Sequence, residues 1–79
     1  MREKIMIQER DIIALTNPIQ QHDLQPGDVG TVLLVHENGS AYEVEFTTLI
    51  GDTIAVLTIS NEDIRKVSSR EIAHVRELS

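Results

Sequence analysis

The dipeptide Asn38-Gly39, placed between two β-rich runs, constrains this fold more than any other feature of the chain. A two-residue hairpin turn needs φ above zero at both central positions, and Asn followed by Gly tolerates this best. The run before it, 29–37, is rich in β-branched residues, and 41–46 follows it. The pattern predicts an antiparallel hairpin, in which Gly30 marks a bulge or a close approach of two backbones.

The second strand of this hairpin alternates strictly between apolar and acidic residues. Tyr42, Val44 and Phe46 share one face, and Glu43 and Glu45 share the other. Such alternation is typical of an antiparallel strand with one face in the core and one in water. We therefore expect both aromatic residues to be buried and the two glutamates to form an acidic outer face.

Other turn signals divide the rest of the chain. In 25–28, Pro26 presets φ for the first central position of a type II turn and Gly27 suits the second. A second turn is expected at 50–52, and one helical turn at 60–63 begins at a cap residue, Ser60 or Asn61. Three further strands are expected, over 10–15, 53–59 and 64–67.

Five short strands joined by tight turns predict an all-β fold. The expected architecture is a small five-stranded SH3-like barrel over residues 10–67, because closure removes exposed sheet edges. An OB-fold would need longer strands and a true helix, for which the chain has no room. Residues 1–9 form an N-terminal flank, and 68–79 form a C-terminal one.

The C-terminal flank carries a helix pattern. Ser68 and Glu71 have the spacing of a capping box, and Ile72, Val75 and Leu78 recur on one helical face. We expect a short amphipathic helix over 68–79. An isolated helix of this length is marginal in water, so it needs a surface. That surface is either its own barrel or a second chain.

The first strand is apolar on both faces. Ile13 and Leu15 alternate with Ile12 and Ala14, and the fourth strand shows the same property. A small barrel buries one face of each strand, so another element should cover the second face. The candidates are Lys4–Ile7, the C-terminal helix, or another protein, including a second copy of this chain.

Composition excludes several classes of function. The chain has 13 acidic residues against 7 Lys and Arg, a net charge of −6, and the excess lies within 10–67. A nucleic-acid binder usually needs a basic face, so nucleic acid is an improbable partner. Without Cys, neither a disulfide nor a zinc–thiolate site can form. No membrane span or signal peptide is visible, and we expect a cytoplasmic protein.

No set of residues predicts catalysis, a cofactor or a metal. His36 with Glu43 or Glu45 would give only two ligands, whereas a specific site needs three or four. The carboxylates fall in turns or on the solvent face, where a raised pKa is not expected. Tyr42 and Phe46 fall on the inward face, so they do not offer a stacking platform for bases. We predict a protein that is not an enzyme.

Four blocks of the chain resemble a bacterial domain-of-unknown-function family, the one numbered 4926. They are Asp11–Thr16, Leu24–Val32, Tyr42–Phe46 and Thr53–Thr58. The resemblance spans residues 11–67 and implies an SH3-like barrel without established catalytic residues. It also implies an antitoxin or immunity role, since members are thought to be encoded beside toxin genes. The stretch Gly27–Val32 is similar to KOW-type SH3-like modules.

These observations predict a protein-binding module, in its most concrete form an antitoxin-like neutraliser of a basic toxin. An acidic surface favours a basic partner, and exposed apolar residues supply affinity. The alternatives are a KOW-like accessory domain of the ribosome or transcription machinery, and a homodimer or larger homo-oligomer with a structural role. The candidate partner-binding residues are Glu37, Glu43, Glu45, Asp52, Ile12, Ile72, Val75 and Leu78.

Overall fold

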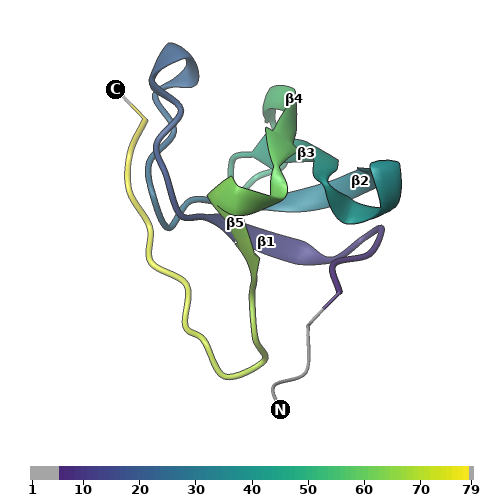
Figure 1. Cartoon of the computed structure of the whole chain (residues 1–79). Coiled ribbons are helices and arrows are strands. Elements are labelled where there is room, and N and C mark those ends of the chain that lie inside the picture. Colours follow the sequence, from purple (N-terminus) through teal and green to yellow (C-terminus); the bar gives the residue numbers. More distant parts are fainter. Residues whose placement is uncertain (1–5, 79) are drawn as a thin grey trace.

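The computed structural model describes residues 6–78 and places five strands in one antiparallel sheet (Figure 1). The strands are β1 (Ile12–Leu15), β2 (Val29–His36), β3 (Ala41–Thr47), β4 (Thr53–Ser60) and β5 (Ile64–Lys66). Single 3-10 turns form η1 (Gln20–His22), η2 (Glu37–Gly39) and η3 (Asn61–Asp63). The order across the sheet is β4-β3-β2-β1-β5, so the last strand returns beside the first. The all-β, five-stranded prediction is confirmed.

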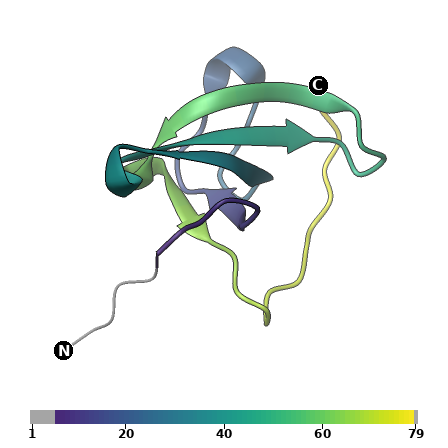
Figure 2. The same ribbon diagram turned by 90° about the vertical axis from the view of Figure 1, so that its right-hand side faces the viewer.

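The sheet curves around its core but is not closed into a barrel (Figure 2). Within residues 6–78, β4 and β5 are its two edge strands and do not pair with each other. After β4, η3 turns the chain so that Ile64 pairs with Leu15 of β1. All three residues of β5 pair with β1, so only the opposite edge of this short strand faces away from the sheet.

The core lies on the concave face of the sheet, where β3 supplies its centre. Tyr42, Val44 and Phe46 are 5%, 0% and 1% exposed, which confirms the alternation expected for this strand. Burying apolar surface of this kind is the main stabilising contribution to a small domain. The other buried apolar residues of this cluster are Ile13, Leu15, Leu24, Val32, Ile59 and Ile64.

The hairpin between β2 and β3 is present, but its turn is wider than expected. His36 pairs with Ala41, which leaves four residues in the loop instead of two. Glu37, Asn38 and Gly39 all have positive φ, at 49°, 59° and 96°. The expected left-handed conformation at Asn38 and Gly39 is therefore correct, and Glu37 joins the turn instead of ending the strand.

The remaining turn predictions agree with the structure. Gly27 has φ +93°, and the Asp28 N–H donates to the Gln25 carbonyl at 3.0 Å, as a type II turn requires. At η3, the Ser60 hydroxyl accepts from the Glu62 N–H at 3.2 Å. Ser60 is thus the cap of the single helical turn before the last strand.

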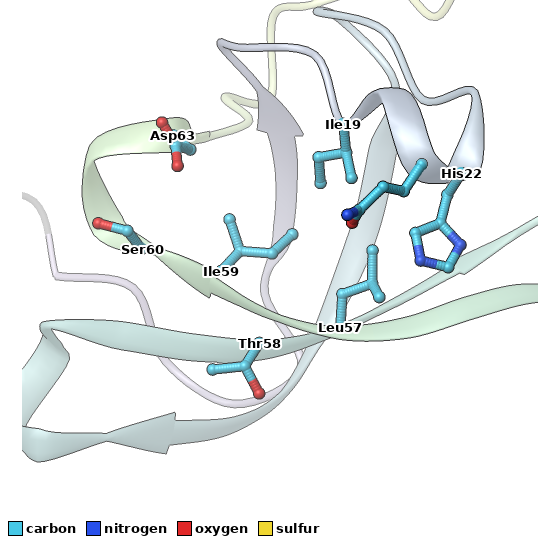
Figure 3. Close-up of a pocket in the computed structure, with 8 residues that line it drawn as sticks. Ile19, His22, Leu57, Thr58, Ile59, Ser60 and Asp63 are labelled. Atoms are coloured by element: carbon cyan, nitrogen blue, oxygen red, sulfur yellow. The ribbon is translucent and has the colours of Figure 1, made fainter.

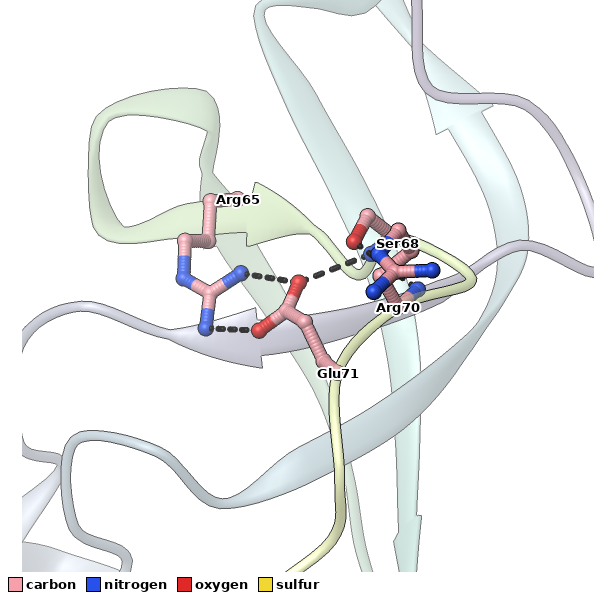
Figure 4. Close-up of polar contacts among 4 residues, drawn as sticks. All are labelled: Arg65, Ser68, Arg70 and Glu71. Atoms are coloured by element: carbon pink, nitrogen blue, oxygen red, sulfur yellow. Dashed lines mark hydrogen bonds and ion pairs between the residues drawn. The ribbon is translucent and has the colours of Figure 1, made fainter.

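The C-terminal segment corrects one prediction. The residues from Ser68 to Leu78 form no helix, and Ile72 and Val75 are 88% and 74% exposed. Part of the capping box does form, because the Ser68 N–H donates to the Glu71 carboxylate at 2.8 Å (Figure 4). Helix propagation then fails, since the segment runs back along the molecule to the loop before β2 (Figure 1). An extended chain reaches roughly twice as far per residue as a helix does.

The N-terminal flank packs in part against the core. Ile7 contacts the core cluster, and Met6 is 66% exposed. Of the expected covering segment Lys4–Ile7, residues 4 and 5 lie outside the described residues. Ile7 therefore packs against the core, and not over the second face of the strands that this segment was expected to cover.

Candidate protein-binding face

The convex outer face of the sheet carries a row of four residues, one from each of four adjacent strands. Ile12 pairs with Thr31, Thr31 with Glu45, and Glu45 with Val56. Residues directly opposite each other in antiparallel strands project to the same side. The row therefore has an apolar residue at each end, Ile12 and Val56, and polar residues at its centre. Ile12 and Val56 are 45% and 46% exposed.

A second row crosses the same face. Leu34 pairs with Glu43, and Glu43 pairs with Thr58. A register shift between Val32 and Leu34 places Leu33 at a bulge, so both consecutive leucines reach solvent, at 44% and 42% exposed. The bulge thereby adds apolar surface beside the carboxylate of Glu43.

The two central carboxylates have weak local partners. Glu43 Oε1 lies 4.0 Å from His36 Nε2, and Glu45 Oε2 accepts from the Thr53 hydroxyl at 2.8 Å. No Lys or Arg among the described residues forms a salt bridge with either of them. Their negative charge therefore stays available for a partner. We name six residues the outer patch: the charged or exposed apolar members of the two rows, together with Leu33 at the bulge. They are Ile12, Leu33, Leu34, Glu43, Glu45 and Val56.

The other predicted binding residues lie apart from this patch. Glu37 and Asp52 occupy turns at opposite ends of β3, and the Glu37 carboxylate accepts from the Ser40 hydroxyl at 3.1 Å. Ile72, Val75 and Leu78 lie on the extended tail, with Leu78 40% exposed. Of the eight predicted residues, the structure brings together Ile12, Glu43 and Glu45 in one patch. Leu33, Leu34 and Val56 complete it and were missing from the prediction.

A hollow of about 230 Å³ lies between η1 and β4 (Figure 3). Ile19, Leu57 and Ile59 form its apolar floor. His22 lies at one side and Asp63 at the other, beyond Ile59 (Figure 3). Asp63 also accepts a hydrogen bond from the Asn17 amide at 2.7 Å. The imidazole and the carboxylate are thus separated by apolar side chains and do not act as a pair.

A larger groove of about 700 Å³ opens between the N-terminal flank, the η2 loop and β5. Val35, Tyr42 and Ile64 lie at its base, and Arg65 and Lys66 line its rim. Both cations are engaged within the chain. Arg65 donates to both carboxylate oxygens of Glu71, at 2.7 and 2.8 Å, and Lys66 Nζ lies 3.4 Å from Asp11. The groove therefore offers apolar surface without an unpaired charge.

Within residues 6–78, no group of three or more His, Asp or Glu side chains is placed to hold a metal ion. His36 and Glu43 come near each other without a third ligand. In the same part of the chain, no helix has the length and apolar character needed to cross a membrane.

The fold and the outer patch together define a small antiparallel β domain with a mixed acidic and apolar surface. The chain belongs to the family described as Domain of unknown function (DUF4926), whose model matches residues 9–66. This match covers all five strands and leaves the tail outside it. The search of the curated proteins and that of the solved structures returned no match.

Proposed function

We propose that this protein is a non-enzymatic module that binds a basic protein partner through the outer patch. The observation that carries the proposal is the placement of Glu43 and Glu45 between exposed apolar residues of neighbouring strands. Contiguous apolar surface on a small domain, flanked by charge, is typical of an interaction site. The net charge of −6 favours a basic partner over an acidic one.

The two kinds of residue would contribute differently to binding. Exposed carboxylates raise the association rate and select against acidic partners, because their field acts before contact. Apolar residues such as Leu34 and Val56 would provide affinity through burial at the centre of the interface. The binding rate should therefore depend strongly on salt, and the dissociation rate much less.

An antitoxin-like role is the most concrete form of this proposal. An acidic module can occupy the substrate channel of a basic toxin, for instance a nuclease, by electrostatic complementarity. We further propose that the domain is SH3-like. The meander β1 to β4, the return of β5 beside β1, and the single 3-10 turn between β4 and β5 support this assignment.

The test compares two double variants with the same change in charge. Glu43→Lys/Glu45→Lys alters the outer patch, and Glu9→Lys/Glu62→Lys alters two exposed glutamates that are not among its six residues. Each variant raises the net charge of −6 by four. Each tagged protein is used to capture partners from lysate of its host, and the captured protein is then purified for binding kinetics.

The proposal expects a basic protein that binds the wild type and Glu9→Lys/Glu62→Lys, with association at least tenfold slower for Glu43→Lys/Glu45→Lys. Equal association rates for the two double variants would overturn it. Capture of ribosomal proteins together with RNA would favour the accessory-domain alternative. Recovery of untagged copies of this chain, with a doubled mass in light scattering, would favour the homo-oligomer.

A further inference from the structure

The tail is fastened to the body of the domain at two points. Near its start, Glu71 pairs with Arg65 of β5 (Figure 4). Near its end, Arg76 contacts the loop before β2: its Nε donates to Asp28 Oδ1 at 2.9 Å and its Nη2 donates to Asp28 Oδ2 at 2.5 Å. The same Nη2 donates to the Asp23 carbonyl at 2.7 Å. We name the segment 68–78 the strap.

The loop that receives Arg76 is built independently of the strap. The Gln25 N–H donates to Asp28 Oδ2 at 2.9 Å, which orients the carboxylate. The loop is also tied to β1, because Gly27 N–H donates to the Leu15 carbonyl at 2.8 Å and Leu15 N–H donates to the Asp28 carbonyl at 2.9 Å. The two carboxylate oxygens of Asp28 and the Asp23 carbonyl oxygen all accept from the Arg76 guanidinium. The hydrogen bonds that shape this loop do not involve residues 68–78.

This arrangement suits arginine better than lysine. A guanidinium is planar and presents parallel N–H groups that match both oxygens of a carboxylate, whereas an ammonium is a point charge. The Asp28 side chain is only 20% exposed, so its charge is less screened than that of a surface carboxylate. The Arg76 guanidinium holds the pKa of Asp28 below its ordinary value.

The strap is fastened on either side of Ala14 of β1, which shares the outer face of that strand with Ile12. Ala14 lies on that face, between its pairing partners Val29 and Arg65, and is 2% exposed. The two fastening points of the strap, on Arg65 and on Asp28, flank the same position. Between them the strap shows apolar side chains to water at Ile72 and Val75. The Arg76 contact therefore holds in place a segment that gains little from its own burial.

We propose that Asp28 and the Asp23 carbonyl form an arginine-binding site that Arg76 occupies as an internal competitor, and that an arginine of the basic partner displaces it and releases the strap. The internal Arg76 is tethered close to its site, so its effective concentration is high and it weakens external arginine binding. The proposal rests on the proposed function only in taking the partner to be basic.

The test uses the full chain and a capped Gly-Arg-Gly peptide, with a capped Gly-Lys-Gly peptide for comparison. Titrations are followed by backbone amide chemical shifts, and order in the strap by ¹⁵N relaxation of residues 72–78. Arg76→Ala opens the site, and Arg70→Ala is the control in the same segment. Within residues 6–78 the Arg70 side chain forms no hydrogen bond or ion pair, and its backbone N–H donates to the Ser68 hydroxyl at 3.3 Å.

The expected result has three parts. Residues 72–78 are as ordered as the sheet in the wild type and lose order in Arg76→Ala but not in Arg70→Ala. The arginine peptide binds Arg76→Ala about tenfold more tightly than the wild type, with shifts centred on residues 23–28. Asp28→Asn lowers that affinity at least tenfold, and the lysine peptide binds more weakly than the arginine peptide.

Equal peptide affinities for wild type and Arg76→Ala would overturn the proposal, as would a strap that is already disordered in the wild type. Shifts confined to the outer patch would also overturn it. Glu43→Lys/Glu45→Lys and its matched control should bind the arginine peptide alike, because neither glutamate contacts Arg76 and both variants change the net charge equally. The proposal for the outer patch and the proposal for the arginine site can therefore be overturned independently of each other.

Discussion

Gly30 of β2 lies so close to Val44 of β3 that a Cβ atom built on it would come within 2.6 Å of Val44 Cγ1. The same atom would lie 3.0 Å from the Glu45 carbonyl oxygen and from Phe46 Cε1. The absence of a side chain at Gly30 thus lets β2 cross directly over the centre of the core. Glycine is needed at position 30 because a side chain there would clash, and not because the backbone conformation requires glycine.

Gly30→Ala is expected to lower the free energy of unfolding by about 1–3 kcal/mol, because the added methyl overpacks a filled site. Val44→Ala alone should cost about 2 kcal/mol through the cavity it leaves. In the double variant the new methyl occupies part of that cavity. Its cost should therefore be smaller than the sum of the two single costs by about 1 kcal/mol.

Urea unfolding followed by circular dichroism measures all three variants. The control is Gly51→Ala combined with Val44→Ala, since a Cβ on Gly51 would meet nothing within 4 Å. That pair should be additive. Additivity of the Gly30→Ala and Val44→Ala costs would show that the two residues do not share space.

Much of the fold follows from local chemistry. The alternation of 41–46 and the turn residues at 25–28 identify which side chains are inside and where β2 begins, because each signal acts over a few neighbouring residues. The local sequence did not predict the width of the hairpin turn between β2 and β3. Glu37 adopts φ 49°, which costs energy in a residue with a side chain, and only the pairing of His36 with Ala41 explains it.

A matched pair of substitutions should separate the core from the outer patch. Val32 is fully buried and Val56 is 46% exposed. Thr has nearly the shape of Val, so the change mainly adds a hydroxyl. Val32→Thr should cost about 1–3 kcal/mol of unfolding free energy, because the hydroxyl is buried without a guaranteed partner. Val56→Thr should stay within about 0.5 kcal/mol of the wild type.

The same pair also tests the binding face. Val56→Thr should keep the wild-type urea midpoint while accelerating dissociation of the captured partner. Val32→Thr should instead lower the urea midpoint. An unchanged dissociation rate for Val56→Thr would remove Val56 from the interface. A large loss of stability in Val56→Thr would instead mean that its side chain is part of the core.

The sequence predicts the acidic half of the outer patch better than its apolar half. Glu43 and Glu45 follow from strict alternation in their strand. Leu33 and Leu34 do not, because 29–37 is apolar on both faces and the position of the bulge depends on pairing with β3. The contact between Arg76 and Asp28 joins residues 48 positions apart, so no local pattern could indicate it.

Acid should detach the strap. The Arg65 guanidinium lowers the pKa of Glu71 to about 2, and Arg76 lowers that of Asp28. A lowered folded-state pKa gives stability that is complete above the ordinary value and is lost as pH falls through the folded one. For Glu71 the loss runs from its ordinary value of 4.5 down to about 2.

Carboxyl ¹³C shifts of Glu71 and Asp28, recorded with the order of residues 72–78 from pH 7 to pH 2, measure this detachment. The strap should be fully attached at pH 7 and should lose order below pH 4.5, before the sheet unfolds. Glu71→Gln lacks the ion pair with Arg65 and cannot titrate at this position, so its pH dependence should show the Asp28 contribution alone. An ordinary pKa for Glu71 in the wild type would contradict the contact in Figure 4.

Val75→Pro distinguishes the extended strap from the amphipathic helix that its sequence pattern favours. Proline costs about 3 kcal/mol inside a helix, because it removes an N–H donor and clashes with the preceding turn. In an extended segment it is tolerated, and Val75 is 74% exposed. The far-ultraviolet circular dichroism and the urea midpoint should therefore match those of Val75→Ala, the control. A loss of helical signal at 222 nm in the proline variant only would mean that the tail is helical in solution and that Arg76 does not hold it in the extended form.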